Sequence, residues 1–179
     1  FSNLIRFPSM NSYEFFAKGY SEYENILLNF RNNPNAAPYV DNDFMYQKNI
    51  ESSIKFNSSI VWKRIDDIYP VPLFQKELIH PNYIIQGQIG DDYLISALSQ
   101  FSKDSSEIPS LFECSIPNSI LHEVENSINL KSGAVLIYLY AFGRRTPILI
   151  DTLIPMIGNE PLYSHPIKGK SPWFCLVEK

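Results

Sequence analysis

The stretch IIQGQIGDDYLISAL, residues 84–98, decides how the rest of the chain is interpreted. Its first half is a loop that contains Gly87 and Gly90, and glycines allow a tight turn. The second half repeats apolar residues at the spacing of one helical face, which predicts a helix over 91–101. We therefore expect the loop to fold back and to place Gln86 beside the first turn of that helix.

The residue at position 92 determines which chemistry this arrangement can support. An amide side chain close to the first residue of a helix can donate a hydrogen bond to the oxyanion of an acyl-transfer reaction. A helix N-terminus also lowers the pKa of a thiol placed there, which favours the nucleophilic thiolate. The chain has Asp92 at this place, and a carboxylate attacks amides poorly because its acyl adduct is a high-energy mixed anhydride. We therefore expect Gln86 to lie at an oxyanion-hole position and Asp92 to be inert.

The adjacent residues Asp91 and Asp92 raise the alternative of a catalytic carboxylate pair. Aspartic proteases use two carboxyl groups that share a proton across a cleft. Neighbouring residues at the start of a helix do not face each other in that way. The simpler interpretation is that both acidic residues satisfy free N–H groups of the helix and suit its dipole.

Composition limits the class of protein. The chain has 179 residues, of which 45% are hydrophobic and 19% charged, so we predict one folded domain with a substantial core. The net charge is −4 and the basic residues are scattered, so no nucleic-acid partner is expected. The longest apolar run, 134–142, is about half the length of a membrane-spanning helix, so no membrane span is expected. Two cysteines form no disulfide framework, which favours an intracellular location, cytoplasmic or cytoskeletal.

The hydrophobic periodicity predicts an α+β domain, with helices first and an antiparallel hairpin later. The predicted helix over 91–101 has Leu94, Ala97, Leu98 and Phe101 on one face. The other predicted elements are a helix over 13–31, a short helix broken by prolines within 62–74, a helix over 117–128, a hairpin of 134–142 and 148–151 joined by a turn at 143–147, a loop over 155–170, and the start of a last helix within 171–179.

The segment QGQIGDDYLISAL resembles the calpain motif QG-x-x-GDCW-x-L-x-A, with Asp92 for the cysteine and Tyr93 for the tryptophan. Further segments resemble calpain segments in the same order along the chain. These are YVDNDF at 39–44, VWKRIDDI with PLF within 61–74, FGRRTPILIDTLIP at 142–155 and LYSHPIKGKSPWFCLVEK at 162–179. Agreement of five motifs in order and spacing is much more specific than one short motif. The resemblance implies a papain-like fold, with the first subdomain of a calpain protease core over 39–179 after a helical lead segment over 1–38.

The resemblance also implies what this chain would lack. In calpains the cysteine acts with a His and an Asn on a second subdomain, which would follow residue 179 and is expected to be absent. The family's calcium site would use acidic residues at the positions of Tyr83 and Ser171. Because Ca²⁺ needs several anionic or carbonyl oxygens, we expect this site to be lost, with no metal and no cofactor.

Other candidate residues carry weaker signals. Cys114 and Cys175 are expected to be core cysteines, and His80, His122 and His165 have no metal-like spacing. Together, these observations predict a calpain-like cysteine peptidase domain that is catalytically inactive, a pseudoprotease with a structural, scaffold or regulatory role. Its expected partners are proteins or peptides, in a larger chain or assembly. The alternative is an active calcium-dependent cysteine endopeptidase when the chain is part of a longer protein.

Overall fold

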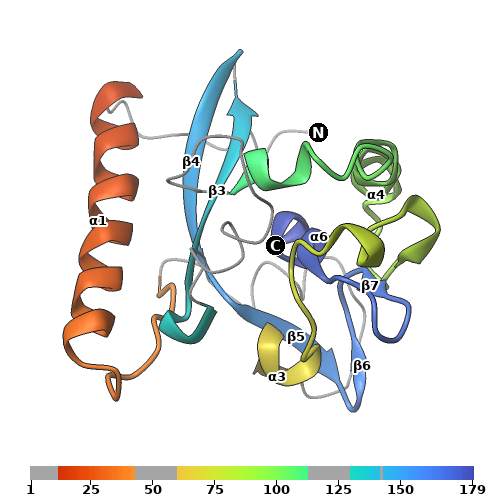
Figure 1. The fold of residues 1–179 in the computed structure, drawn as a ribbon, viewed down its shortest axis with the longest axis horizontal. Helices are drawn as coiled ribbons and strands as arrows, with labels where there is room; N and C mark the ends of the chain where they lie inside the picture. Colours follow the sequence, from red (N-terminus) through yellow and green to blue (C-terminus); the bar gives the residue numbers. More distant parts are fainter. Residues whose placement is uncertain (1–11, 43–59, 113–129, 142) are drawn as a thin grey trace.

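The computed structural model describes residues 12–42, 60–112, 130–141 and 143–179 (Figure 1). The helix predicted over 117–128 lies outside the described residues, as do Cys114 and His122. The main elements are α1 (Ser12–Asn32), β1 (Ile60–Arg64), α3 (Ile65–Ile68), β2 (Ile84–Ile85), α4 (Asp92–Phe101), β3 (Ala134–Ala141), β4 (Arg144–Asp151), β5 (Leu153–Ile157), β6 (Glu160–Pro161), β7 (His165–Pro166) and α6 (Trp173–Glu178). Short 3₁₀ turns lie at Lys76–Leu78, Pro81–Tyr83, Ile108–Leu111 and Leu130–Ser132.

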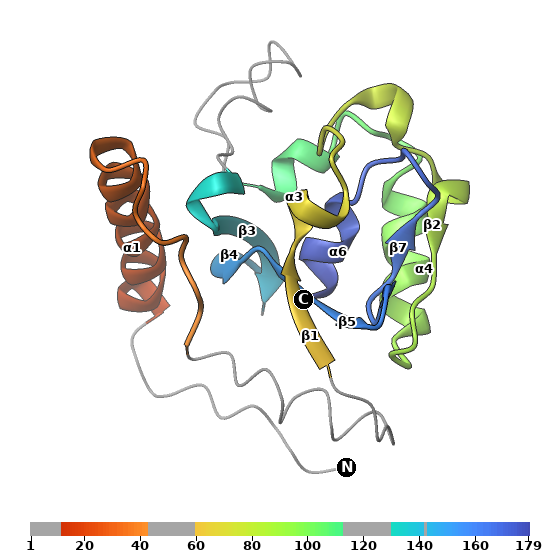
Figure 2. The same ribbon diagram turned by 90° about the horizontal axis from the view of Figure 1, so that it is seen from below.

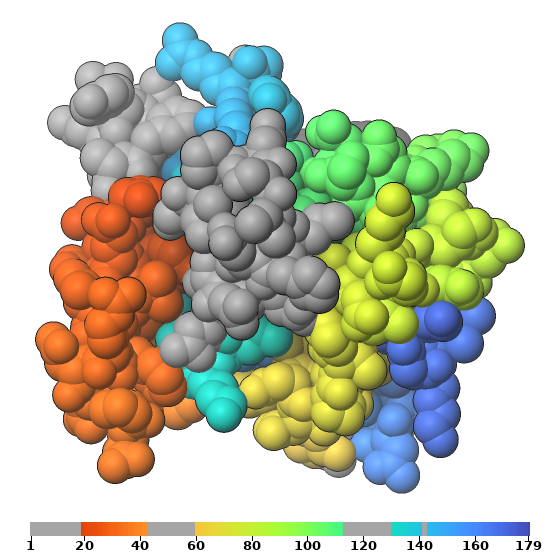
Figure 3. Space-filling view, in the orientation of Figure 1, coloured from red at the N-terminus to blue at the C-terminus, as the bar shows by residue number. Residues whose placement is uncertain are grey.

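The described strands form small antiparallel sheets, so the α+β class is confirmed. One sheet has the order β1-β5-β6, a second pairs β2 with β7, and the third is the β3–β4 hairpin. Helix α6 lies between this hairpin and α4 in both ribbon views (Figures 1 and 2). Helix α1 covers the other side of the hairpin and forms one side of the surface in Figure 3.

Helix α6 is the centre of the main core. Its sequence WFCLVE has five buried residues in succession, 173–177, so the helix is surrounded by other elements rather than lying on the surface. Burial of each large apolar side chain stabilises the fold by about 1.5–3 kcal/mol. The prediction that a helix starts within 171–179 is confirmed. The core around α6 includes Phe74 and Phe112, whose rings meet edge to face at 4.9 Å between centroids.

The long helix α1 matches the helix predicted over 13–31 within one residue at each end. It packs on β3 and β4 through a second apolar cluster that contains Tyr23, Ala134 and Leu136. The apolar face of α1 therefore packs on the hairpin of the same domain.

Helix α4 starts one residue later than predicted, at Asp92, and Asp91 is its N-cap residue. Its buried residues are Ile95 and Leu98. Ala97, predicted on the apolar face, is exposed, because the face that meets the core is rotated toward Ile95.

Three sequence predictions of secondary structure are wrong in detail. Residues 60–64 form strand β1 and not part of a helix, because Trp62 pairs with Pro155 in the sheet. The hairpin turn is shorter than 143–147, since β4 already begins at Arg144. The segment 155–170 is not all loop, because β5 continues to Ile157 and β6 and β7 follow. Pro155, Pro161 and Pro166 made the segment 155–170 resemble a loop. Pro161 and Pro166 lie in strands at sheet edges, where proline is tolerated, whereas Pro155 lies in the central strand β5.

Candidate functional site

Gly87 is the residue that determines how the loop before α4 runs. A Cβ atom at this position would lie 2.3 Å from the carbonyl oxygen of Leu162 and 2.4 Å from the carbonyl carbon of Tyr163. Only glycine fits without movement of that backbone. The N–H of Gln88 donates to the same Leu162 oxygen at 2.8 Å, which fixes the loop against the chain between β6 and β7. Gly90 has no such constraint, because a Cβ there would meet nothing within 4 Å.

The loop brings Gln86 to the start of α4. The Nε2 of Gln86 donates a hydrogen bond to Oδ1 of Asp92, the first residue of the helix. Both side chains are exposed to solvent. The positive end of the helix dipole lies at this place and stabilises the carboxylate anion. The amide that could donate to a developing oxyanion is therefore engaged by a permanent anion of the same chain.

Tyr93 follows Asp92 and is 80% exposed. An exposed tyrosine presents a large apolar ring with a polar end, which suits contact with another molecule. The surface beside Gln86 and Asp92 thus combines an anion, an amide and an aromatic ring.

Asp91 does not act as a helix cap through its side chain, contrary to the interpretation that both acidic residues satisfy free N–H groups. No side-chain cap hydrogen bond is present at the start of α4, and Asp91 is only 8% exposed. Helix α4 packs against α6, and Oδ1 of Asp91, like Oε1 of Glu178 at the end of α6, is buried without a hydrogen-bond partner among the described residues. The carboxyl group of Asp91 interacts electrostatically with that of Glu178. Glu178 also accepts hydrogen bonds on Oε2 from the N–H and the Oγ of Ser164.

Burial, and secondarily the neighbouring charge of Asp91, raises the pKa of Glu178 to about 8, against the opposing effect of the Ser164 hydrogen bonds. The sequence analysis missed this residue. The only available signal was an acidic residue at the end of an otherwise apolar helix.

The expected calcium positions hold residues that do not fit a calcium ion. The Lys170 ammonium nitrogen lies 4.3 Å from the ring centroid of Tyr83, so a protein cation already sits against this ring. The Oγ of Ser171 donates to the carbonyl of Leu73, and its N–H donates to the carbonyl of Leu78 at 3.1 Å. Ca²⁺ binds several anionic or carbonyl oxygens, and neither of these side chains supplies a carboxylate or a carbonyl. Within the described segments, no group of three or more His, Cys, Asp or Glu residues could hold a metal.

The surroundings of Cys175 and His80 are structural, whereas His165 lies in β7 opposite Ile85 and its Nδ1 is buried without a hydrogen-bond partner among the described residues. Cys175 is fully buried, its Sγ donates to the carbonyl of Ser164 at 3.1 Å, and burial holds its pKa well above the ordinary value. The expectation of a core cysteine is confirmed for Cys175. The Nδ1 of His80 accepts a hydrogen bond from the N–H of Asn82 at 3.2 Å, as in a turn.

A buried ion pair joins the end of α6 to the end of β4. The Nζ of Lys179 donates to Oδ1 of Asp151 and, at 3.0 Å, to the carbonyl of Leu153. Both charged side chains are 0% exposed. The other carboxylate oxygen of Asp151 accepts from the N–H of Asp41 at 2.8 Å. This contact links the segment that follows α1 to the hairpin and to the end of α6.

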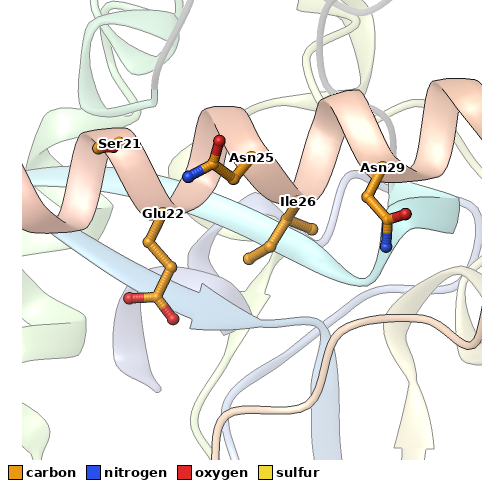
Figure 4. A pocket seen from close by; sticks show the side chains of 5 residues that line it. All are labelled: Ser21, Glu22, Asn25, Ile26 and Asn29. Carbon is orange, nitrogen blue, oxygen red and sulfur yellow. The ribbon is translucent and has the colours of Figure 1, made fainter.

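Two hollows on the described surface lie along α1. One is an open depression whose lining residues all come from α1 (Figure 4): Ser21, Glu22, Asn25, Ile26 and Asn29. A second, smaller hollow lies between α1, residues 36–39 and Ser132. Neither contains the convergent set of ionisable groups that a catalytic site requires.

With this geometry in place, comparison with known proteins identifies the class. A family model described as "Calpain family cysteine protease" matches residues 38–179. The chain belongs to the calpain family of cysteine proteases, and this membership supports a papain-like protease domain.

Individual relatives agree with the family match. Calpain-5 of Caenorhabditis elegans is 26% identical over 123 residues, which cover 69% of this chain and 18% of that protein. The calpain-1 catalytic subunit of Homo sapiens is 24% identical over 124 residues, or 67% of this chain and 16% of that protein. The matched region thus spans less than a fifth of the length of these relatives. In the described part of the chain, no helix is long and apolar enough to cross a membrane.

Proposed function

We propose that this domain is a catalytically inactive calpain-like module that binds protein or peptide partners and has a structural, scaffold or regulatory role. Asp92 stands in this proposal at the position of the family's cysteine, and residues 39–179 correspond to the first subdomain of the protease core, after a helical lead segment over 1–38. The location is intracellular, cytoplasmic or cytoskeletal, as the cysteine usage favours.

The observation that supports inactivity is the hydrogen bond from Gln86 to Asp92. A carboxylate at the helix start is stabilised as an anion by the dipole and by the amide, and both effects make it less reactive toward a carbonyl. The same contact occupies the donor that a substrate oxyanion would need. A substrate carbonyl would have to displace the carboxylate of Asp92 from the Gln86 amide, and a charged acceptor forms a stronger hydrogen bond than a neutral carbonyl.

The observation that supports binding is the exposed surface beside this pair. Tyr93 is 80% exposed and adjoins Asp92, so a peptide could stack on its ring while a donor of the peptide reaches the carboxylate. Aromatic residues are frequent energetic centres of protein interfaces, where truncation to alanine can cost about 2 kcal/mol or more.

A peptide-binding screen with the folded chain tests the binding proposal, and the chain offers a matched control. Tyr140, in β3, is 77% exposed and belongs to the hairpin rather than to α4. Peptides selected on the native chain should lose about 30-fold in affinity with Tyr93→Ala, the equivalent of about 2 kcal/mol. They should bind normally to Tyr140→Ala. Equal effects of both substitutions would place the binding surface elsewhere.

The second candidate is an active calcium-dependent cysteine endopeptidase in a longer protein that supplies a thiol and a general base. The family match favours it, whereas the surroundings of Tyr83 and Ser171 disfavour calcium dependence. A peptidase assay on the longest native form, with and without calcium, separates the two candidates.

A further inference from the structure

The contact between Asp91 and Glu178 joins two helices that are distant in sequence. Asp91 is the N-cap residue of α4, and Glu178 is the last residue of α6. Two oxygens at this contact, Oδ1 of Asp91 and Oε1 of Glu178, are buried and have no hydrogen-bond partner among the described residues when both groups are ionised. Buried carboxylate oxygens without donors are rare in folded proteins because desolvation is costly.

A proton on one of the two groups removes this difficulty. A protonated carboxyl group donates one hydrogen bond, so the pair gains a donor for an otherwise unsatisfied oxygen. Protonation also removes the repulsion between two like charges in a poorly solvated place. Carboxyl groups in contact commonly bind one proton between them for these reasons.

Among the described residues, neither the hydrogen-bond partner of Oε2 nor the causes of the pKa shift of Glu178 include a cation. Its Oε2 accepts from Ser164, which is neutral. Three ionisable neighbours act electrostatically with it: the phenols of Tyr69 and Tyr163 and the thiol of Cys175. Burial is the main cause that raises the pKa of each, so all three are uncharged near neutral pH. The adjacent Lys179 directs its ammonium group to Asp151 and Leu153.

We propose that Asp91 and Glu178 hold one shared proton, and that this proton fixes the first turn of α4 to α6. The inference goes beyond the proposed function and holds whether or not the surface at Tyr93 binds a partner. It makes Glu178 a positioning residue for the start of α4.

The pH range follows from the raised pKa of about 8 for Glu178. An ordinary glutamate loses its proton near pH 4.5, the value that applies to the unfolded chain. Between these values the folded state binds a proton that the unfolded state has lost. Stability is therefore greatest at the acidic end of this range and falls as pH rises to about 8, with up to about a tenfold change in the folding equilibrium constant per pH unit.

The first turn of α4 is joined by backbone hydrogen bonds to Asp91, one of the two residues that share the proton. The N–H groups of Leu94 and Ile95 donate to the backbone carbonyl of Asp91, at 2.8 Å and 3.2 Å. Asp92, the next residue, holds the hydrogen bond from Gln86. When the shared proton is lost, repulsion between the two carboxylates moves Asp91 away from α6 and loosens this turn.

Urea unfolding of the full chain from pH 5.5 to 8.5 tests the proposal. Glu178→Gln supplies an amide donor to Asp91 in place of the proton. The slope of the variant's free energy of unfolding against pH should therefore be smaller than that of the native chain, by the equivalent of about one bound proton. The control Glu77→Gln changes an exposed carboxylate in the 3₁₀ turn Lys76–Leu78 and should retain the native pH dependence. An unchanged pH dependence in Glu178→Gln would overturn the proposal.

Two further measurements keep the test decisive if Glu178→Gln does not fold. The side-chain carboxyl of Glu178, followed by carbon NMR in the native chain, should titrate near pH 8, and in Asp91→Asn its midpoint should fall by more than one unit. A midpoint near the ordinary value of about 4.3 in the native chain would contradict a shared proton. Above pH 8, amide exchange at Leu94 and Ile95 should be at least fivefold faster in the native chain than in Glu178→Gln at the same pH. Equal rates would refute the link to α4.

Discussion

Replacement of Gly87 by alanine tests the account of how the loop places Gln86. The new Cβ would lie 2.3 Å from the carbonyl oxygen of Leu162 and 2.5 Å from that of Tyr163. These are backbone atoms, which cannot rotate away as a side chain can. Overpacking of this kind costs about 1–3 kcal/mol or more, and displacement of the loop also breaks the Gln88 to Leu162 hydrogen bond, worth about 1 kcal/mol. We expect Gly87→Ala to lower the free energy of unfolding by about 2–4 kcal/mol.

The chain provides a matched control three residues later. A Cβ at Gly90 would meet nothing within 4 Å, so Gly90→Ala should change stability by less than about 1 kcal/mol, with a small gain because alanine restricts the unfolded chain. Urea unfolding monitored by tryptophan fluorescence measures both variants against the native chain. If Gly87→Ala is as stable as Gly90→Ala, the loop does not approach the backbone of Leu162 and Tyr163 as closely as described.

Other predictions concern the buried groups and the expected loss of calcium binding. Lys179→Met removes the cation that pairs with the buried carboxylate of Asp151, so the free energy of unfolding should fall by about 3–5 kcal/mol. The exposed Lys168→Met is the control, and equal losses would contradict the account. Cys175 should remain unmodified by iodoacetamide at pH 8 until the chain unfolds, because burial keeps its thiol protonated; peptide mass mapping that finds it alkylated in the folded state would contradict this. Addition of calcium should leave Tm unchanged, since ligand binding would raise it, and a rise of several degrees would show that a site exists.

Periodic helices were the part of the fold that the sequence predicted well. The spacing of apolar residues in 13–31 and 91–101 reflects one buried face of a helix, and α1 and α4 have these bounds within one residue or two. Helix α6 was predicted from a short apolar segment. These elements depend mainly on local periodicity, which a single sequence contains.

The small strands were predicted less well because they depend on distant partners. Trp62 lies in a strand because it pairs with Pro155, and no local pattern contains that information. Prolines 155, 161 and 166 lie in β5, β6 and β7, where a sequence pattern alone indicates a loop. Tertiary pairing decided the structure of these segments against their local propensity.

In the candidate site, too, the local arrangement was predicted from the sequence and the interaction between distant segments was missed. The spacing of Gln86 and Asp92 around two glycines was sufficient to predict that their side chains meet, and they do. The carboxyl contact of Asp91 with Glu178 was missed, because α4 and α6 are distant in sequence and the contact depends on how they pack. The sequence suggested instead that Asp91 caps the helix, which its burial and lack of a cap hydrogen bond exclude.

Intact-mass analysis with an epoxide inhibitor of cysteine proteases tests the central claim most directly. The native chain, in its longest available form, and Asp92→Cys are incubated with the inhibitor, with and without calcium. The account predicts no mass increase for the native chain in either condition. It predicts a single adduct for Asp92→Cys, reduced by Gln86→Ala, because the helix start and the Gln86 amide then act on a thiol. An adduct on the native protein would contradict the account, because it would show that a cysteine elsewhere in the protein is reactive.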